Sequence, residues 1–137
     1  MNEELENKIN KYYSEAMPVR NQLVYKYNTS KPEESEEYSI HISFEENEEN
    51  TPTTDKIHIL MDVNNQEKYL EIKSINLYEK SGNGLGRKLI EITEKLASEL
   101  GSEKIRLLST EEAKPKWESF GYEQKGDYHI KQFNRNV

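Results

Sequence analysis

Three glycines stand close together in the segment 81–88, which reads SGNGLGRK. Glycine has no Cβ, so the backbone of such a segment can approach a ligand closely. The apolar residues that follow recur at helical spacing, and the first N–H groups of a helix have no partner within it. Together with the helix dipole, these donors favour an anion such as a phosphate or pyrophosphate. Arg87 and Lys88 add two cations to the first turn, either as part of such a site or as an exposed, solvated pair.

Two other phosphate-binding patterns fit this segment poorly. Counted from Gly82, the dinucleotide-binding fingerprint GxGxxG needs a glycine where Arg87 stands, and a side chain there obstructs close packing of the helix on a strand. The P-loop pattern ending in Gly-Lys-Ser/Thr does not occur. The chain before the glycines also reads as successive strands, not as βα units. Rossmann and P-loop folds are therefore disfavoured.

Hydrophobic periodicity places the glycine segment between a strand and a long helix. Apolar residues at 85, 89, 92, 96 and 100 form one face of that helix, and Gly101 suits its C-terminal cap. Pro115 suits the first turn of a later, short helix. The predicted elements are a helix over 3–16, strands over 21–27, 38–44, 57–63, 69–78 and 104–109, helices over 85–100 and 113–120, and a final hairpin of 122–124 with 128–133.

The strand before the glycines contains an irregularity. Its apolar residues change phase by one position, in the order Leu70, Ile72, Ile75, Leu77. A regular strand cannot keep both pairs on one face, so we expect an extra residue, a β-bulge, at Lys73 or Ser74. The alternative is a strand that is buried on both faces.

Composition and charge restrict the class of protein. The 137 residues carry a formal charge of −7, and the excess lies before residue 51, because 51–137 holds 14 acidic and 14 basic residues. Net negative charge repels phosphate backbones, so we expect no nucleic-acid partner and no anionic membrane. The chain lacks cysteine and shows no membrane-spanning run or secretion signal, so a soluble, cytoplasmic protein is expected. The length suits one domain over 1–137.

The run SGNGLG, followed by RKLIEI, resembles the acetyl-coenzyme A loop of the GNAT superfamily of N-acetyltransferases, which reads Arg/Gln-x-x-Gly-x-Gly/Ala and opens a long helix. A second family pattern, Asn-x-x-Ala-x-x-x-Tyr-x-x-x-Gly-Phe, is matched in spacing by Thr110, Ala113, Trp117, Gly121 and Tyr122. The resemblance is specific over 69–122. It implies an α/β (α+β) fold whose mixed, mostly antiparallel central sheet has about six to seven strands, flanking helices and a splay between strands four and five.

The resemblance also implies a reaction and a site. Acetyl-coenzyme A would be the co-substrate, its acetyl group would pass directly to a primary amine, and no metal would take part. A backbone amide would stabilise the oxyanion formed during attack. Glu71 is the candidate base, and the alternative is an ordinary surface glutamate. The residues assigned to acetyl-coenzyme A are Ile75, Asn76 and Leu77 beside the pantetheine, Gly82, Asn83, Gly84, Leu85, Gly86 and Arg87 around the pyrophosphate, and Thr110 and Trp117.

Three positions depart from the family pattern. Ser81 stands in place of Arg or Gln, and Thr110 replaces an Asn that often contacts the pantetheine arm. Trp117 replaces the Tyr whose hydroxyl protonates the leaving thiolate in many members, and an indole does not supply that proton. Ser109, Tyr122 or water would then act as the acid; the alternative is a catalytically inactive GNAT-fold binding or regulatory protein.

The acceptor side has no direct counterpart in the family. GNAT proteins generally place two helices between strands one and two, whereas only 28–37 lies there in this chain, and the amphipathic helix precedes the first strand. The acidic first half suggests a cationic acceptor, either a small molecule or a protein, bound by a monomer or a homodimer. We expect His41, His58 and His129 to be exposed on strand faces without metal, and the glutamates at 33–37 and 45–49 to be solvated.

Overall fold

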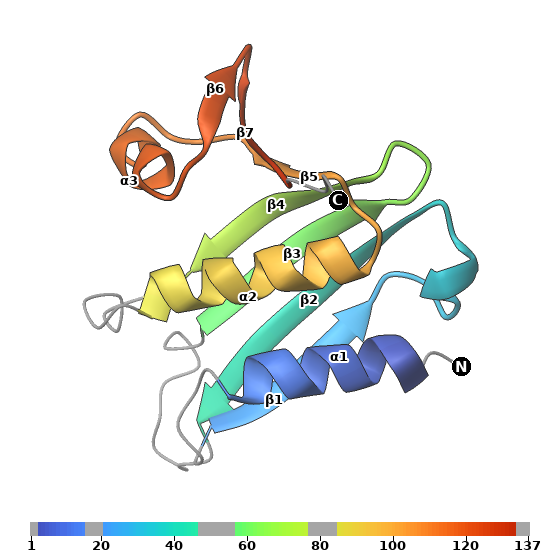
Figure 1. Ribbon diagram of the computed structural model, residues 1–137. Helices are drawn as coiled ribbons and strands as arrows, with labels where there is room; N and C mark the ends of the chain where they lie inside the picture. Colours follow the sequence, from blue (N-terminus) through green and yellow to red (C-terminus); the bar gives the residue numbers. More distant parts are fainter. Residues whose placement is uncertain (1–2, 16–20, 47–56, 77–84, 134–137) are drawn as a thin grey trace.

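The computed structural model describes residues 3–15, 21–46, 57–76 and 85–133. Figure 1 shows a single twisted sheet with two long helices, α1 and α2, lying side by side across it. The elements are α1 Glu3–Ser14, β1 Asn21–Tyr27, the 3-10 turn η1 Pro32–Glu34, β2 Glu37–Glu46, β3 Ile57–Asn64, β4 Tyr69–Asn76, α2 Leu85–Glu99, β5 Lys104–Leu107, α3 Lys114–Ser119, β6 Glu123–Lys125 and β7 Tyr128–Gln132.

The sheet has seven strands in the order β1-β2-β3-β4-β5-β7-β6. Every neighbouring pair is antiparallel except β4 and β5, which run parallel and are joined across α2. This topology confirms the mixed, mostly antiparallel sheet that the resemblance implies. The predicted elements are confirmed within two residues at each end; β5, for example, ends at Leu107, two residues earlier than expected. The predicted end of the fourth strand at 77–78 lies outside the described residues.

The hydrophobic core lies between the sheet and the two long helices (Figure 1). Strand side chains alternate between the two faces, so each strand contributes every second residue to this layer. The central strands supply Ile40, Ile42, Phe44, Ile59, Met61, Val63, Leu70, Ile72, Ile105 and Leu107; the helices supply Leu5, Ile9, Tyr13, Leu89, Ile92, Leu96 and Ala97. No helix of the described residues covers the opposite face of β1–β5, which carries mostly polar side chains.

A buried hydrogen bond joins α1 to α2. The hydroxyl groups of Tyr13 and Thr93 lie 2.6 Å apart, and the Thr93 hydroxyl also donates to the carbonyl of Leu89. Tyr13 is therefore the donor in the pair, and its burial raises the pKa of the phenol. This contact places a helix from the start of the chain beside the helix that follows the glycine segment.

Two glycines end helices in the left-handed conformation. At Gly101, with φ of +91°, the N–H of Ser102 reaches the carbonyl of Ala97 and closes α2 as predicted. At Gly121, with φ of +95°, the N–H of Tyr122 reaches the carbonyl of Trp117 in the same way. The second turn carries the chain from α3 directly into the β6–β7 hairpin. None of the helices in the described part of the chain is both long and apolar enough to cross a membrane.

Candidate functional site

Strands β4 and β5 separate halfway along β4. Their pairing covers four residues of each strand and ends where Ile72 faces Leu107. Beyond this point β4 continues to Asn76 and pairs with β3 alone among the described residues. The edge of β4 at 73–76 that faces away from β3 therefore has no strand partner in the described structure. This separation is the splay that the family resemblance implies.

A β-bulge lies where the splay begins. Leu60 of β3 faces Ser74 and the next residue, Met61, faces Ile72, so Lys73 is the extra residue of β4. The structure confirms the bulge that the phase change predicts and assigns it to Lys73. Because a bulge bends and twists its strand, it turns the end of β4 away from β5.

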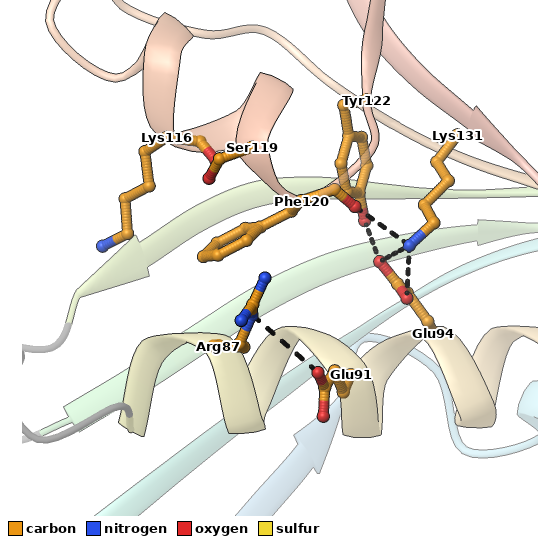
Figure 2. A network of polar contacts seen from close by, with 8 residues as sticks. All are labelled: Arg87, Glu91, Glu94, Lys116, Ser119, Phe120, Tyr122 and Lys131. Atoms are coloured by element: carbon orange, nitrogen blue, oxygen red, sulfur yellow. Dashed lines mark hydrogen bonds and ion pairs between the residues drawn. The ribbon is translucent and has the colours of Figure 1, made fainter.

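The first turn of α2 lies at the same end of the sheet as the splay (Figure 1). Arg87 is exposed, with its guanidinium 5.5 Å from the centre of the Phe120 ring and 4.0 Å from a Glu91 oxygen. Figure 2 shows this guanidinium directed from α2 toward Phe120, which follows α3. The exposed Lys88 reaches the carbonyl of Glu15 at 3.4 Å.

The predicted pyrophosphate loop falls mostly outside the described residues. Gly82, Asn83 and Gly84 of this loop lie there, as does Leu77, which was assigned to the pantetheine. The assigned roles of these four residues stay predictions. Asn76 is the last residue of β4, and Leu85 and Gly86 open α2. Ile75, also assigned to the pantetheine, lies in β4 beyond the bulge, faces Ile59 of β3 and is partly buried against the core.

Glu71 lies on the helix-free face, one residue before the last paired position of β4. Although 5% exposed, it is paired with two cations: Nε of Arg106 donates to Oε1 at 2.7 Å, and Nζ of Lys73 donates to Oε2 at 3.1 Å. The guanidinium of Arg106 is itself stacked between Tyr69 and Tyr128, 3.9 and 4.3 Å from their ring centres. The candidate base is thus held at a fixed position, with both carboxylate oxygens accepting hydrogen bonds.

The Trp117 indole is part of the core. It is 8% exposed and packs edge-on against the rings of Tyr122 and Phe120, with centroids 5.3 and 6.1 Å away. Thr110 is exposed, and its hydroxyl accepts a hydrogen bond from the Ala113 N–H at the turn before α3. Their assigned contacts with the pantetheine arm stay predictions.

A charged network fixes the end of α3 to α2 (Figure 2). The Tyr122 hydroxyl donates to Oε2 of Glu94 at 2.9 Å, while Nζ of Lys131 lies 3.1 Å from Oε1 and donates to the carbonyl of Phe120. Burial, followed by the Glu94 charge, raises the pKa of Tyr122. This environment makes Tyr122 a poor proton donor to a thiolate. Tyr122, one of the three acids that the sequence suggests, is therefore disfavoured. The other, Ser109, donates its hydroxyl proton to the carbonyl of Thr110.

The network had no signal in the sequence. Glu94 lies in a helix and Lys131 in a strand, 37 residues apart along the chain. In the sequence, each has the pattern of an ordinary exposed, charged residue. The sequence indicates only that Tyr122 follows Gly121, the glycine that ends a helix. Which residue Tyr122 contacts depends on the topology of the sheet.

The prediction of an exposed His129 is wrong. This side chain is 1% exposed, and its Nε2 lies 3.5 Å from a Glu118 oxygen. His129 faces Leu107 of β5, so it shares the apolar face of the sheet. His41 is exposed as predicted, and His58 is partly buried, with the two rings 5.4 Å apart. Among the residues described, no three His, Asp or Glu side chains gather closely enough to hold a metal ion.

A groove lies on the helix side of the molecule, away from the splay. This groove of about 450 Å³ runs between α1 and the C-terminal part of α2, and is lined by Glu4, Asn7, Lys8, Lys11, Tyr12 and Glu99. Two of its side chains are acidic and two are basic, and the hydrogen bond to Glu99 raises the pKa of Tyr12. Its place at the far end of α2 separates it from the residues assigned to acetyl-coenzyme A.

No protein-family model matches the sequence, and a search of curated proteins found no significant match. Solved structures do match. Elp3 of the archaeon Methanocaldococcus infernus, with residues 1–46 deleted, gives a TM-score of 0.60 at 15% identity over 89% of this chain and 33% of its own. GCN5 of Tetrahymena gives 0.54 at 11% identity over 71% of each chain. Nourseothricin acetyltransferase gives 0.52 at 12% identity over 87% of this chain and 92% of its own.

These likenesses concern the backbone, because the identities are low. The chain spans about a third of the length of the Elp3 chain. Each of the three aligns with this chain at a TM-score above 0.5, and the chain itself forms a mostly antiparallel sheet with one parallel pair, β4 and β5, and flanking helices. The chain therefore has the GNAT fold.

Proposed function

We propose that the protein transfers an acetyl group from acetyl-coenzyme A to a primary amine by direct attack. The observation that carries this proposal is the splay of β4 from β5 at a bulge, at the same end of the sheet as the first turn of α2. Backbone N–H and C=O groups along an unpaired strand edge match the amides of a pantetheine arm. The start of α2 and the exposed Arg87 suit its phosphates.

The proposed chemistry requires three groups beside the thioester: a donor to the oxyanion, a base and a proton donor for the thiolate. Acetyl-coenzyme A supplies an activated acyl group as a thioester. A backbone amide near 75–77 would stabilise the negative charge that develops on the carbonyl oxygen. Glu71 would accept the proton that the attacking amine must lose, once its contact with Lys73 is broken. With Trp117 buried, Tyr122 bonded to Glu94 and the Ser109 hydroxyl bonded to the Thr110 carbonyl, water is the remaining proton donor for the thiolate.

The proposed acceptor is cationic. Before residue 51 the chain has 12 acidic and 5 basic residues, and α1 and the β1–β2 connection belong to this part. A positively charged amine would be drawn to this half, whereas the charge-balanced half contains the parts assigned to acetyl-coenzyme A. This division suits one anionic and one cationic substrate.

A catalytically inactive binding protein is the second candidate. The buried Trp117 and the doubly paired Glu71 favour it, because neither offers the free acid or base that GNAT chemistry uses. Such a protein would bind acetyl-coenzyme A without turnover. The two functions therefore differ in turnover with an amine, and both predict binding of acetyl-coenzyme A.

Calorimetry with acetyl-coenzyme A, followed by thiol release with a panel of primary amines, tests the proposal. Binding with turnover supports the enzyme, binding without turnover supports the inactive module, and the absence of binding removes both. Arg87→Ala should weaken binding, since it removes an exposed cation at the start of α2. Lys95→Ala is the matched control, because it removes an exposed cation from the middle of the same helix.

A further inference from the structure

Lys73 occupies a particular position in the splay. It is the extra residue of the bulge, and its ammonium lies 3.1 Å from Oε2 of Glu71. The side chain is 44% exposed, whereas that of Glu71 is 7% exposed. The carboxylate proposed to take the proton of an acceptor amine thus already binds a primary ammonium group, and that group belongs to the chain itself.

We propose that Lys73 is itself an acetyl acceptor, so that the protein acetylates its own bulge residue. This inference rests on the proposed function, because it requires a thioester beside the β4 edge at 73–76. Lys73 begins that edge and is the first residue of β4 beyond the last pair with β5. A flexible lysine side chain at this place needs only to leave Glu71 in order to reach along the edge.

The reaction balances without any further reagent. The Lys73 ammonium first gives one proton to Glu71 or to water, and its Nζ lone pair then attacks the thioester carbonyl. An N–C bond forms, the C–S bond breaks, and the departing sulfur takes the second proton lost by nitrogen. The products are an amide, coenzyme A as a thiol and one proton released to solvent. Nothing is oxidised or reduced.

The charges around Lys73 explain why the rate of self-acetylation would be low at neutral pH and higher at high pH. The hydrogen bond and the charge of Glu71 raise the pKa of Lys73, and Asp62 on β3 and Tyr128 on β7 act in the same direction more weakly. Arg106 on β5 opposes them by neutralising Glu71 from the other side. The amine is mostly protonated at neutral pH, so the rate should rise as pH rises.

Acetylation would also change Glu71. An acetylated Lys73 has no charge, so Glu71 would keep its ion pair with Arg106 alone and its Oε2 would be open to an external amine. The modification would convert a site occupied by the chain's own lysine into one that can receive an acceptor.

The test incubates the folded, full-length protein with acetyl-coenzyme A and locates the acetyl group by peptide mass spectrometry. We expect Lys73 to be modified first, at a rate that saturates with acetyl-coenzyme A and rises with pH. Lys73→Arg should abolish this modification while keeping a cation beside Glu71. Lys104→Arg is the matched control, because Lys104 lies on β5 at the closed end of the β4–β5 pair, where it faces Tyr69.

Two results would overturn the inference. One is equal acetylation of Lys73 and exposed lysines such as Lys68, and the other is a rate that stays linear in acetyl-coenzyme A, as chemical acetylation gives. Calorimetry on the same sample tests the proposed function separately from self-acetylation. Binding of acetyl-coenzyme A without modification of Lys73 refutes self-acetylation alone, whereas no binding refutes the proposed function as well.

Discussion

The hydroxyl of Tyr122 donates a 2.9 Å hydrogen bond to the carboxylate of Glu94, which the Lys131 ammonium also approaches to 3.1 Å. Tyr122 directly follows the glycine that ends α3, and Glu94 lies in the middle of α2. The contact therefore sets the position of α3 relative to the helix that begins beside the splay (Figure 2). It makes the carboxylate of Glu94 a structural element of the candidate site.

Glu94→Ala should destabilise the protein by about 2 kcal/mol, because hydrogen bonds to a charged group contribute about this much and two donors lose their acceptor. Urea unfolding measures the change. Glu91→Ala is the control on the same helix, since its oxygen lies 4.0 Å from Arg87 and both side chains are exposed. It should cost less than about 0.5 kcal/mol. Equal losses in the two variants would contradict a structural role for the network.

Glu71→Gln should lower turnover with an amine while acetyl-coenzyme A still binds. The amide keeps the size of the side chain and can still accept a hydrogen bond from Arg106, but it cannot take a proton. A general base contributes at least about 10²-fold, so a loss of this size in kcat is expected. Glu67→Gln, in the exposed β3–β4 turn, is the control and should leave kcat unchanged. An unaltered kcat in Glu71→Gln would assign the carboxylate to ion pairing alone.

Trp117→Tyr should raise turnover, because a phenol can protonate the leaving thiolate and an indole cannot. The change removes part of a buried ring that packs on Phe120 and Tyr122, so a stability cost of about 1–3 kcal/mol is expected as well. Trp117→Phe has a similar loss of volume without the hydroxyl and should not gain activity. If both variants lose turnover equally, the packing of the indole is what the site needs.

Local sequence signals were sufficient to predict most of the fold. The phase change between Ile72 and Ile75 gave the bulge, and the glycine at 101 gave the end of α2, because both follow from the geometry of one element. The splay and the sheet order came from the family resemblance instead. No property of β4 or β5 by itself requires the two strands to be neighbours.

Long-range pairing is what the sequence could not show. His129 lies in a strand of mixed polar and apolar residues, which suggests exposure, yet it is on the core side of the sheet, because the buried Leu107 is its cross-strand neighbour. The two cations on Glu71 come from the bulge and from a strand 35 residues away. Burial of a histidine and pairing of a carboxylate both depend on which strands become neighbours, and this information lies in the topology.

The stability of the protein should fall as pH falls through the range in which His58 titrates. Burial, together with the nearby His41, lowers the pKa of His58 below its ordinary value of 6.5. Between the two values the unfolded chain binds a proton more readily than the folded one, so acidification favours unfolding. Urea unfolding from about pH 7.5 to about pH 5 measures the loss. His41→Asn should reduce it without abolishing it, since burial is the larger cause.

Raising the salt concentration should increase the Michaelis constant of a cationic acceptor. Charges on the acidic first half attract such a molecule at long range, and the screening length falls from about 30 Å at 0.01 M salt to about 8 Å at 0.15 M. A polyamine and a monoamine of similar chemistry form the matched pair, because attraction grows with the charge of the acceptor. The polyamine should lose affinity steeply and the monoamine only slightly. Parallel responses of the two acceptors would assign the glutamates of the first half to solubility alone.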